Sequence, residues 1–390
     1  MVASLLYSSR DINLETAEDI VQDSFSAALK DWEKNGLPIN ATGWLYKVCK
    51  HKALNRIRKD KRTQGYTEDM DLQAVEIKFA ETAFDDQQLK LLFACAHPDL
   101  TPKTQVVITL KYVANLKVEA IAKILAMTID GVDKILLRAR QKIKDEKILL
   151  EEPVSTALKP RLPIVHKILY LIFNEGYKSS WGKEILREEL CEDALLMTKG
   201  LIDSGIANQD TAALYALMLF NSARFKSRFG ASGEVLDLEQ QDRSLWNTDL
   251  ILLATDFLLQ SRNEKLSTYH LEASIVFIHC TAKSFKATDW NTITQLYEQL
   301  LRGNPNPFVE LNYAIALYYA GQKNRAFAIL NQLHRHPFFN QYCLLNITLG
   351  KFHRLEGDDT KAKQFLTQAY GLTTFELEKD FIQKMINDLN

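Results

Sequence analysis

Apolar residues recur at helical spacing along most of the chain. The first such pattern runs from Val21 to Trp32 after Thr16, which is a suitable N-cap, and a segment with glycine and proline at 34–40 ends it. A second helix is expected from about Thr42, with apolar side chains on one side and basic side chains on the other. The two patterns predict a pair of amphipathic helices joined by a loop.

A helix-turn-helix is predicted further along the chain. The helical pattern after residue 86 is broken at His97-Pro98 and Thr101-Pro102, and it closes with a short helix at 117–125, a turn and a longer helix at 129–143. Many helical hairpins share this spacing, so the spacing alone leaves both DNA binding and ordinary packing open.

The chain after Pro153 is helical in pattern and contains a repeat. Segments 314–330 and 350–366 match at a fixed offset of 36 residues. Small residues where two helices cross, a glycine in the turn and a leucine on the second helix are typical of tetratricopeptide hairpins, whose usual period is about 34. We therefore predict an all-α chain with tetratricopeptide-like repeats near 274–370. The matched pairs are Ala314/Gly350, Gly321/Gly357, Ala326/Ala362 and Leu330/Leu366.

Composition supports helices and argues against metal or disulfide chemistry. The 15 Gly and 9 Pro in 390 residues fall below the usual fractions of about 7% and 5%. The five cysteines are an odd number without a C-x-x-C pair, so we expect no disulfide, no metal and no cofactor. The amino terminus has no signal-peptide pattern, and the apolar stretch 250–259 is too short to span a bilayer. We predict a cytoplasmic protein with no membrane contact.

Charge is arranged in blocks although the net charge is only -1. Segment 47–62 has eight basic residues and one acid, 66–86 has seven acids and one lysine, and 134–147 has six basic residues and two acids. Any single block is typical of a solvated helix face. The order cation, anion, cation favours two nucleic-acid-binding surfaces joined by an acidic linker, because basic side chains neutralise phosphates.

Candidates for catalysis are poor. His166 and Glu175 are nine residues apart and do not share a helical face, and the segment His334 to His336 has no carboxylate nearby in sequence. We therefore predict that the chain is not an enzyme.

Several motifs resemble bacterial extracytoplasmic-function (ECF) RNA polymerase sigma factors. Segments 16–25 (TAEDIVQDSF), 41–45 (ATGWL) and 53–58 (ALNRIR) resemble sigma region 2, and the helix-turn-helix resembles region 4. Segments 169–177 (LYLIFNEGY) and 242–246 (DRSLW) resemble the subgroup with a long helical, tetratricopeptide-like extension. The resemblance covers nearly the whole chain.

The resemblance implies four parts. They are sigma region 2 at 1–65 with an apparently truncated first helix, an acidic linker at 66–85, a region 4 helix-turn-helix domain at 86–150, and a helical extension at 151–390. The linker is expected to lie in the polymerase's RNA path, where a negatively charged chain can mimic nucleic acid.

The resemblance also implies a sigma factor that binds RNA polymerase core and directs promoter recognition, melting and initiation. Polar loop residues would capture a base flipped out of the minus-ten element, and the recognition helix would enter the major groove of the minus-thirty-five element. The implied residues are Asp19, Gln22 and Asp23 for core binding; Asn35, Asn40, Trp44, Lys47, His51, Asn55, Arg56, Arg58, Lys59 and Arg62 for the minus-ten element; and Thr128, Lys134, Arg138, Arg140 and Lys142 for the minus-thirty-five element.

The extension is expected to modulate activity, either by masking regions 2 and 4 or by supporting them. Its motif residues are Phe173, Asn174, Glu175, Gly176, Tyr177, Asp242, Arg243 and Trp246. Glu175 is a candidate ligand contact, although a buried carboxylate that caps a helix or pairs with Arg243 is an equal alternative. The subgroup suggests a small YCII-related protein as a further partner.

The strongest rival is a core-independent helix-turn-helix DNA-binding regulator with a helical sensor or partner-binding domain. Two DNA-facing surfaces joined by an acidic linker favour the sigma factor, because such a regulator needs only the helix-turn-helix.

Overall fold

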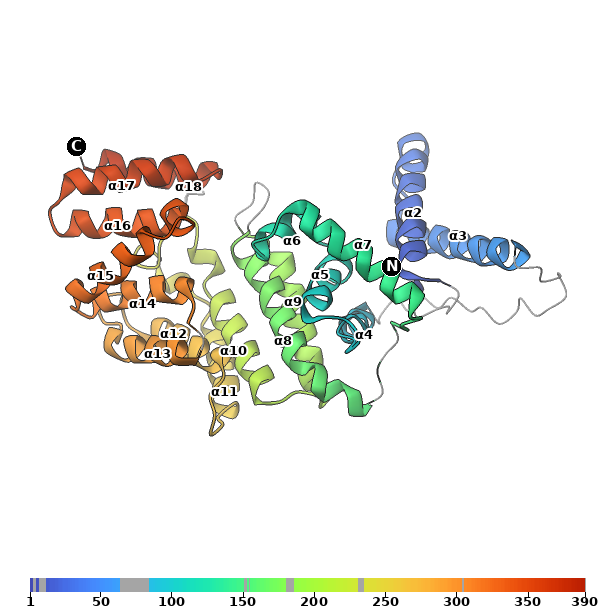
Figure 1. Ribbon diagram of the computed structural model, residues 1–390, viewed down its shortest axis with the longest axis horizontal. Coiled ribbons are helices and arrows are strands. Elements are labelled where there is room, and N and C mark those ends of the chain that lie inside the picture. The colour runs from blue at the N-terminus through green and yellow to red at the C-terminus, as the bar shows by residue number, and fades with distance from the viewer. Residues whose placement is uncertain are drawn as a thin grey trace. The chain divides into compact units, whose positions relative to one another are not determined.

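A computed structural model describes residues 1–2, 5–6, 12–63, 84–150, 153, 155–179, 186–230, 235–303 and 305–389. In these ranges the named elements are all helices, and the one β-type pairing is an isolated bridge between Phe229 and Val235 (Figure 1). The prediction of an all-α fold is therefore confirmed. Nearly all of the predicted acidic linker lies outside the described residues.

The chain divides into two compact units. Unit 1 is Met1–Gly182 with Leu186–Ile206, and unit 2 is Lys183–Ile185 with Ala207–Asn390. The helices of unit 1 are α2 (Leu14–Asn35), α3 (Ala41–Thr63), α4 (Phe84–Cys95), α5 (Pro102–Tyr112), α6 (Val118–Ile124), α7 (Ile129–Asp145), α8 (Ser155–Tyr177) and α9 (Glu188–Asp203). Those of unit 2 are α10 (Gln209–Ser222), η2 (Phe225–Ser227), η3 (Arg243–Leu245), α11 (Thr248–Gln260), α12 (Thr268–Thr281), α13 (Trp290–Gly303), α14 (Pro307–Tyr319), α15 (Lys323–His334), η4 (Phe339–Gln341), α16 (Cys343–Leu355), α17 (Asp359–Leu372) and α18 (Glu376–Asn387).

Helix α2 begins earlier than the sequence pattern predicts. The side chain of Asn13 accepts a hydrogen bond from the Thr16 backbone N–H at 2.9 Å, so Asn13 is the N-cap and the prediction of Thr16 is wrong. Asparagine is at least as good a cap as threonine, and capping at residue 13 adds the apolar Leu14 to the buried part of the helix. Gly36 ends α2 with a φ of 80°, a value that glycine adopts without strain.

Of Val21, Phe25, Ala28 and Trp32, the positions that the helical spacing predicts for the packed face of α2, only Ala28 is buried. Ala17, Ile20, Ser24 and Ala28 are buried, and Ala17 and Ile20 share a cluster with the buried residues of α3, whereas Phe25 is 49% exposed. The small Ala17, Ser24 and Ala28 leave room for the two helices to approach closely. The partner face of α3 is the predicted one, and its buried residues are Cys49, Ala53 and Ile57.

Helices α4 to α7 form the predicted helix-turn-helix domain. Thr101 caps α5 by accepting a hydrogen bond from the Thr104 N–H at 3.3 Å, and Pro102 occupies the first turn, where no N–H is needed. Thr128 caps α7 in the same way, with the Gly131 N–H donating at 3.1 Å. Ala122 of α6 is buried and small where α7 crosses. The proline breaks and the turn are therefore confirmed.

The first two helices of the predicted extension pack on this domain. Helix α4 contacts α8 and α9, α5 contacts α8, and the Arg161 guanidinium donates to the Phe93 carbonyl at 2.7 Å. Leu91 and Leu92 of α4 are fully buried. The compact unit that holds the helix-turn-helix thus continues to Ile206, beyond the predicted boundary at residue 150.

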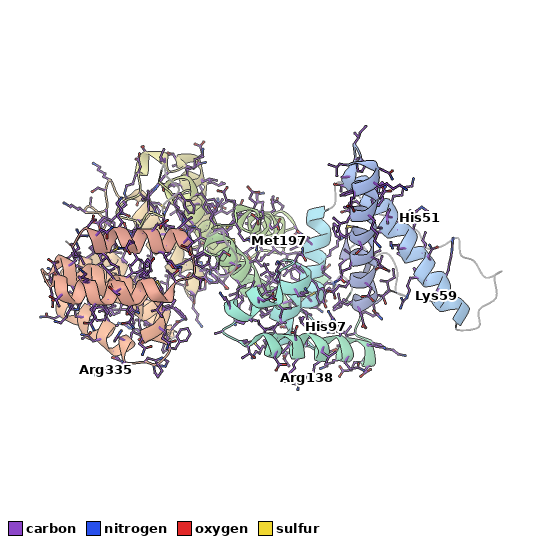
Figure 2. All side chains as sticks on the ribbon, turned by 90° about the horizontal axis from the view of Figure 1, so that it is seen from above. His51, Lys59, His97, Arg138, Met197 and Arg335 are labelled. Carbon is purple, nitrogen blue, oxygen red and sulfur yellow. The ribbon has the colours of Figure 1, made fainter. Side chains whose placement is uncertain are left out.

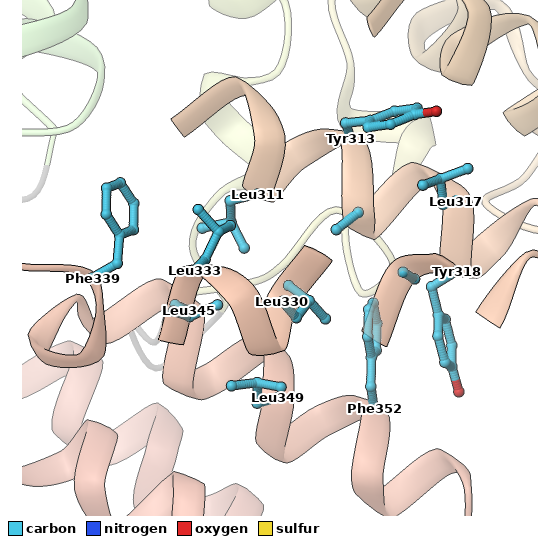
Figure 3. Packing of buried hydrophobic residues seen from close by; sticks show 12 residues of the cluster. Leu311, Tyr313, Leu317, Tyr318, Leu330, Leu333, Phe339, Leu345, Leu349 and Phe352 are labelled. Atoms are coloured by element: carbon cyan, nitrogen blue, oxygen red, sulfur yellow. The ribbon is translucent and has the colours of Figure 1, made fainter. Parts of the chain in front are cut away.

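The sequence repeat corresponds to two helical hairpins in unit 2, α14 with α15 and α16 with α17. Gly321 and Gly357 occupy equivalent turns with φ of 84° and 80°. A Cβ on Gly350 would lie 2.7 Å from Leu366, so α16 and α17 touch where the pattern has a small residue. Figure 3 shows the apolar side chains that these hairpins share, and the Tyr318 and Phe352 rings stack 3.7 Å apart within them.

No helix in the described ranges combines the length and the hydropathy needed to cross a bilayer.

Candidate nucleic-acid interface

Helix α3 carries the larger cationic surface. Its buried side faces α2, and the opposite side exposes a row of polar and basic side chains, among which Figure 2 labels His51 and Lys59. We name this row the α3 surface, and it consists of Lys47, His51, Asn55, Arg56, Arg58 and Lys59. The side chain of Arg62, also expected here, lies outside the described residues.

The two asparagines of the loop before α3 form local hydrogen bonds, and the base-capturing role expected for them stays a prediction. The Asn40 side chain caps α3 by accepting from the Gly43 N–H at 2.7 Å, and Asn35 donates to Asp31 at 2.9 Å. Leu37 and Ile39 between them are strongly exposed. Sequence reasoning missed these two residues, although apolar side chains inside a glycine- and proline-containing loop were a visible signal.

Trp44 is part of the packing between α2 and α3. Its ring lies edge-on to Trp32 with ring centroids 5.6 Å apart. This contact fixes the end of α2 against the start of α3, and Trp44 remains only half-buried.

The predicted core-binding residues share one exposed face of α2. Asp19, Gln22 and Asp23 are exposed, and the apolar Leu29 is exposed one to two turns further along the helix. The core-binding role expected for this face stays a prediction.

The basic residues of α7 are mostly paired within the chain. Lys134 bonds Asp130 at 2.7 Å, and Lys142 donates to the Asp99 carbonyl at 2.6 Å. Arg138 is exposed and makes no hydrogen bond or ion pair with the described residues (Figure 2). Of the basic residues predicted to contact the minus-thirty-five element, Lys134 and Lys142 thus have partners within the chain, whereas Arg138 has none among the described residues.

Arg140 is held most firmly. Its guanidinium bonds the Glu18 carboxylate at 2.7 Å and donates to the Tyr112 hydroxyl at 2.9 Å. Burial, followed by the nearby Glu18 charge, raises the pKa of Tyr112 to about 12, so its hydroxyl stays protonated at neutral pH. A cavity of about 560 Å³ lies beside this group and is lined by side chains from α2, α3, α4 and α5, which include Val21, Phe25 and Leu45.

The motif at 173–177 is a packing motif of α8 and α9. A Cβ on Gly176 would lie 2.7 Å from the Cys191 sulfur, and the Gly176 carbonyl accepts from the Arg187 N–H at 2.7 Å. Phe173 is buried and stacks on Tyr177 with ring centroids 6.1 Å apart.

Glu175 in the same motif is buried, and the Ser179 hydroxyl donates to its carboxylate at 3.3 Å. Its predicted pairing with Arg243 stays a prediction.

The motif at 242–246 forms a short capped turn in unit 2. Asp242 accepts from the Ser244 N–H at 2.9 Å and caps η3. Arg243 donates to the Ala282 carbonyl at 3.0 Å, and the Trp246 indole N–H donates to the Ser227 hydroxyl at 2.7 Å.

No group of three or more histidine, cysteine, aspartate or glutamate side chains in the described part of the chain is placed to hold a metal ion.

Three segments match known protein families. Residues 1–63 match Sigma-70 region 2, residues 90–143 match Sigma-70 region 4, and residues 161–262 match a family of unknown function (DUF6596). Over 385 residues the chain is 28% identical to an uncharacterized protein of Rhizobium meliloti (strain 1021), covering 97% of this chain and 90% of that protein. No solved structure matches the chain.

Both sigma regions are therefore matched in one chain, which supports its assignment as a sigma factor. These matches confirm the prediction of an extracytoplasmic-function sigma factor with a C-terminal helical extension. The sigma regions support promoter recognition as the function, with RNA polymerase core and promoter DNA as partners, and sigma factor families are not enzymes.

Proposed function

We propose that the chain binds RNA polymerase core through α2, opens the minus-ten element with α3 and its preceding loop, and reads the minus-thirty-five element with α7. The observation that carries this proposal is the α3 surface. Six polar or basic side chains face solvent along a helix whose other side is fixed on α2. Such a row can follow a phosphate backbone while the loop beside it meets the bases.

Promoter opening is assigned to the loop at 36–40. Unstacking a base step costs a few kcal/mol, and apolar side chains inserted between bases offset part of that cost. The exposed Leu37 and Ile39 would insert in this way, while Lys47 and Arg58 would hold the neighbouring phosphates.

The minus-thirty-five contact is assigned first to Arg138 and Lys134. Lys134 pairs with Asp130 at an exposed site, and such pairs exchange partners at little cost. Arg140 is bound to Glu18 and Tyr112. It would reach DNA only after this contact opens, so region 2 would hold back one of the cations of region 4.

The extension is assigned two roles. The packing of α8 and α9 on α4 and α5, with Leu91 and Leu92 buried in the same domain, supports a structural role for residues 155–203. Unit 2 would modulate activity. The small YCII-related protein stays a predicted partner.

The decisive experiment is run-off transcription with purified polymerase core, with and without the chain, on templates selected by the reconstituted complex from a random-sequence library. Transcripts that need both components support the proposal. Sequence-specific DNA binding by the chain alone, without any core-dependent transcript, would favour the core-independent regulator instead.

Two truncations separate the roles of the extension. A chain ending at Leu150 loses the helices that cover α4, so we expect region 4 to unfold at lower temperature and transcription to fall. A chain ending at Ile206 keeps all of unit 1. Higher output from that chain than from the full chain means that unit 2 masks the sigma regions, and lower output means that unit 2 supports them. Equal output would contradict a modulating role.

A further inference from the structure

Unit 2 contains a cluster of basic side chains that the proposed function does not use. Arg224 follows α10, Arg243 begins η3, and His279 lies in the last turn of α12. The Cζ atoms of Arg243 and Arg224 lie 4.4 and 5.7 Å from the centroid of the Trp246 ring. Arg224 and His279 are each only 9% exposed. We name Arg224, Arg243, His279 and Trp246 the arginine cluster.

Neutral groups hold the two guanidinium groups in place. Arg224 donates from Nε to the Gln241 side-chain oxygen at 3.3 Å. Arg243 donates to the carbonyls of His279 and Ala282 at the end of α12. The acceptors are an amide oxygen and two backbone carbonyls, which carry no net charge. They therefore do not neutralise the positive charge of either arginine.

No carboxylate in the described part of unit 2 pairs with the cluster. Among these residues, no aspartate or glutamate forms an ion pair with Arg224, Arg243 or His279, and none is among the charges that shift the pKa of Arg243 or His279. Buried arginines are otherwise almost always paired. The two guanidinium groups also repel each other, since the charge of Arg224 lowers the pKa of Arg243 after the larger effect of burial.

Two nitrogen atoms of the cluster have no partner in the described structure. The Arg243 Nη2 and His279 Nδ1 atoms are buried and form no hydrogen bond with any described residue. Burial, then Arg224 and Arg243, lower the pKa of His279 to about 3, so the imidazole is neutral and can still present one N–H. Two positive charges and two free donors together match a group with a negative charge and several acceptor oxygens.

We propose that the arginine cluster binds the oxyanion group, carboxylate or phosphate, of a small molecule. The ligand is small because Arg224 and His279 are about nine-tenths buried, which a protein surface or a nucleic acid could reach only by unfolding this part of unit 2.

The structure also provides a link from this site to the repeat hairpins. Lys351 of α16 bonds Asp237 at 2.7 Å and Glu239 at 2.9 Å, and these two residues precede the turn that carries Arg243. Occupation of the cluster would therefore stabilise this turn together with α16.

The test titrates the full chain with inorganic phosphate and, separately, with citrate, at constant ionic strength balanced by chloride, while thermal unfolding is followed. We expect a saturable rise in the unfolding temperature with at least one of the two anions. A response to phosphate alone identifies a phosphorylated ligand, and a response to citrate alone identifies a carboxylate ligand.

Variants separate specific binding from general salt effects. Arg224→Gln should weaken the anion at least tenfold, Arg224→Lys should retain part of the affinity, and Arg262→Gln, which changes an exposed arginine of the same unit, should bind as the unaltered chain does. Absence of a saturable response, or an equal response in Arg224→Gln, would overturn the proposal. A large loss of unfolding temperature in anion-free Arg224→Gln would do so as well, because it would mean that Arg224 serves only to hold the fold.

Discussion

Helices α3 and α7 are both basic, but their cations have different neighbours. Residues 41–59 of α3 include no aspartate or glutamate, so any acidic partner of its cations lies outside that segment. In α7, Asp130 and Asp145 lie among the basic residues, and Glu146 follows directly. Lys134 and Lys142 pair with acids four residues away, and Arg140 pairs with Glu18. The net charge of a segment therefore does not tell how many of its cations can meet a phosphate.

The difference matters because a paired cation must first give up its partner. An exposed pair contributes at most about 1 kcal/mol, so Lys134 exchanges easily. Arg140 is half-buried and also bonds Tyr112, so its exchange costs more. We expect α3 to supply most of the electrostatic grip on DNA, and α7 to supply a smaller and more selective part.

The largest effect is expected on α3. The double variant Arg56→Ala with Arg58→Ala should reduce run-off transcription about 100-fold, because each hydrogen bond to a charged group contributes about 1.5 kcal/mol or more. Binding of the chain to polymerase core, measured by fluorescence anisotropy, should stay nearly unchanged. Loss of core binding in this variant would mean that α3 contacts the polymerase. It would then contradict the expectation that α3 contributes more to DNA binding than α7.

The buried His279 differs from the basic residues of both α3 and α7, because burial disfavours the protonated form of its imidazole. His279 has a pKa of about 3 in the folded chain and about 6.5 when unfolded. The unfolded state therefore binds more protons between these values, and stability falls as the pH drops below about 6.5. From pH 7 to pH 5 the loss should be about 2 kcal/mol.

Urea unfolding followed by circular dichroism at the two pH values measures this loss. The His279→Gln variant should lack this part of the pH dependence, whereas His51→Gln, which changes an exposed histidine of α3, should retain it. Equal pH dependence in all three chains would show that His279 is accessible to protons in the folded state.

A smaller effect should distinguish two arginines of α7 that lie two residues apart. For the chain alone on a duplex of arbitrary sequence, Arg138→Ala should weaken binding about tenfold, the value of one charged hydrogen bond. Arg140→Ala should weaken it less than threefold, because Arg140 is already bound to Glu18. The sequence of the duplex is unimportant, since phosphate contacts carry no sequence information. Equal losses would mean that the contact with Glu18 opens freely in solution.

The helices and turns were predictable because their signals are local. Thr128 caps α7, and Gly321 and Gly357 fill equivalent turns, since capping and positive φ depend on the residue and its immediate neighbours. The predicted cap at Thr16 failed because Asn13, three residues earlier, offered an equally good side chain.

The state of the site residues was less predictable. Glu18 and Arg140 are 122 residues apart, and no periodicity relates them. The arginine cluster likewise joins residues from three separate segments, and only Arg243 and Trp246 stand in a visible motif. The sequence therefore located the basic helices, but it did not reveal which basic side chains form ion pairs within the protein.

The smallest expected effect comes from breaking the ion pair between Glu18 and Arg140. Removal of the carboxylate by Glu18→Ala should free Arg140 and raise the affinity of the chain for duplex DNA about threefold, within the range expected for a partly exposed ion pair. Glu33→Ala is the control, because it removes an equal charge from an exposed position of α2 that is not among the charges acting on Arg140. The combined variant Glu18→Ala with Arg140→Ala should lose the gain. If the gain persists without Arg140, it reflects the lower negative charge of region 2, and the two regions do not restrain each other.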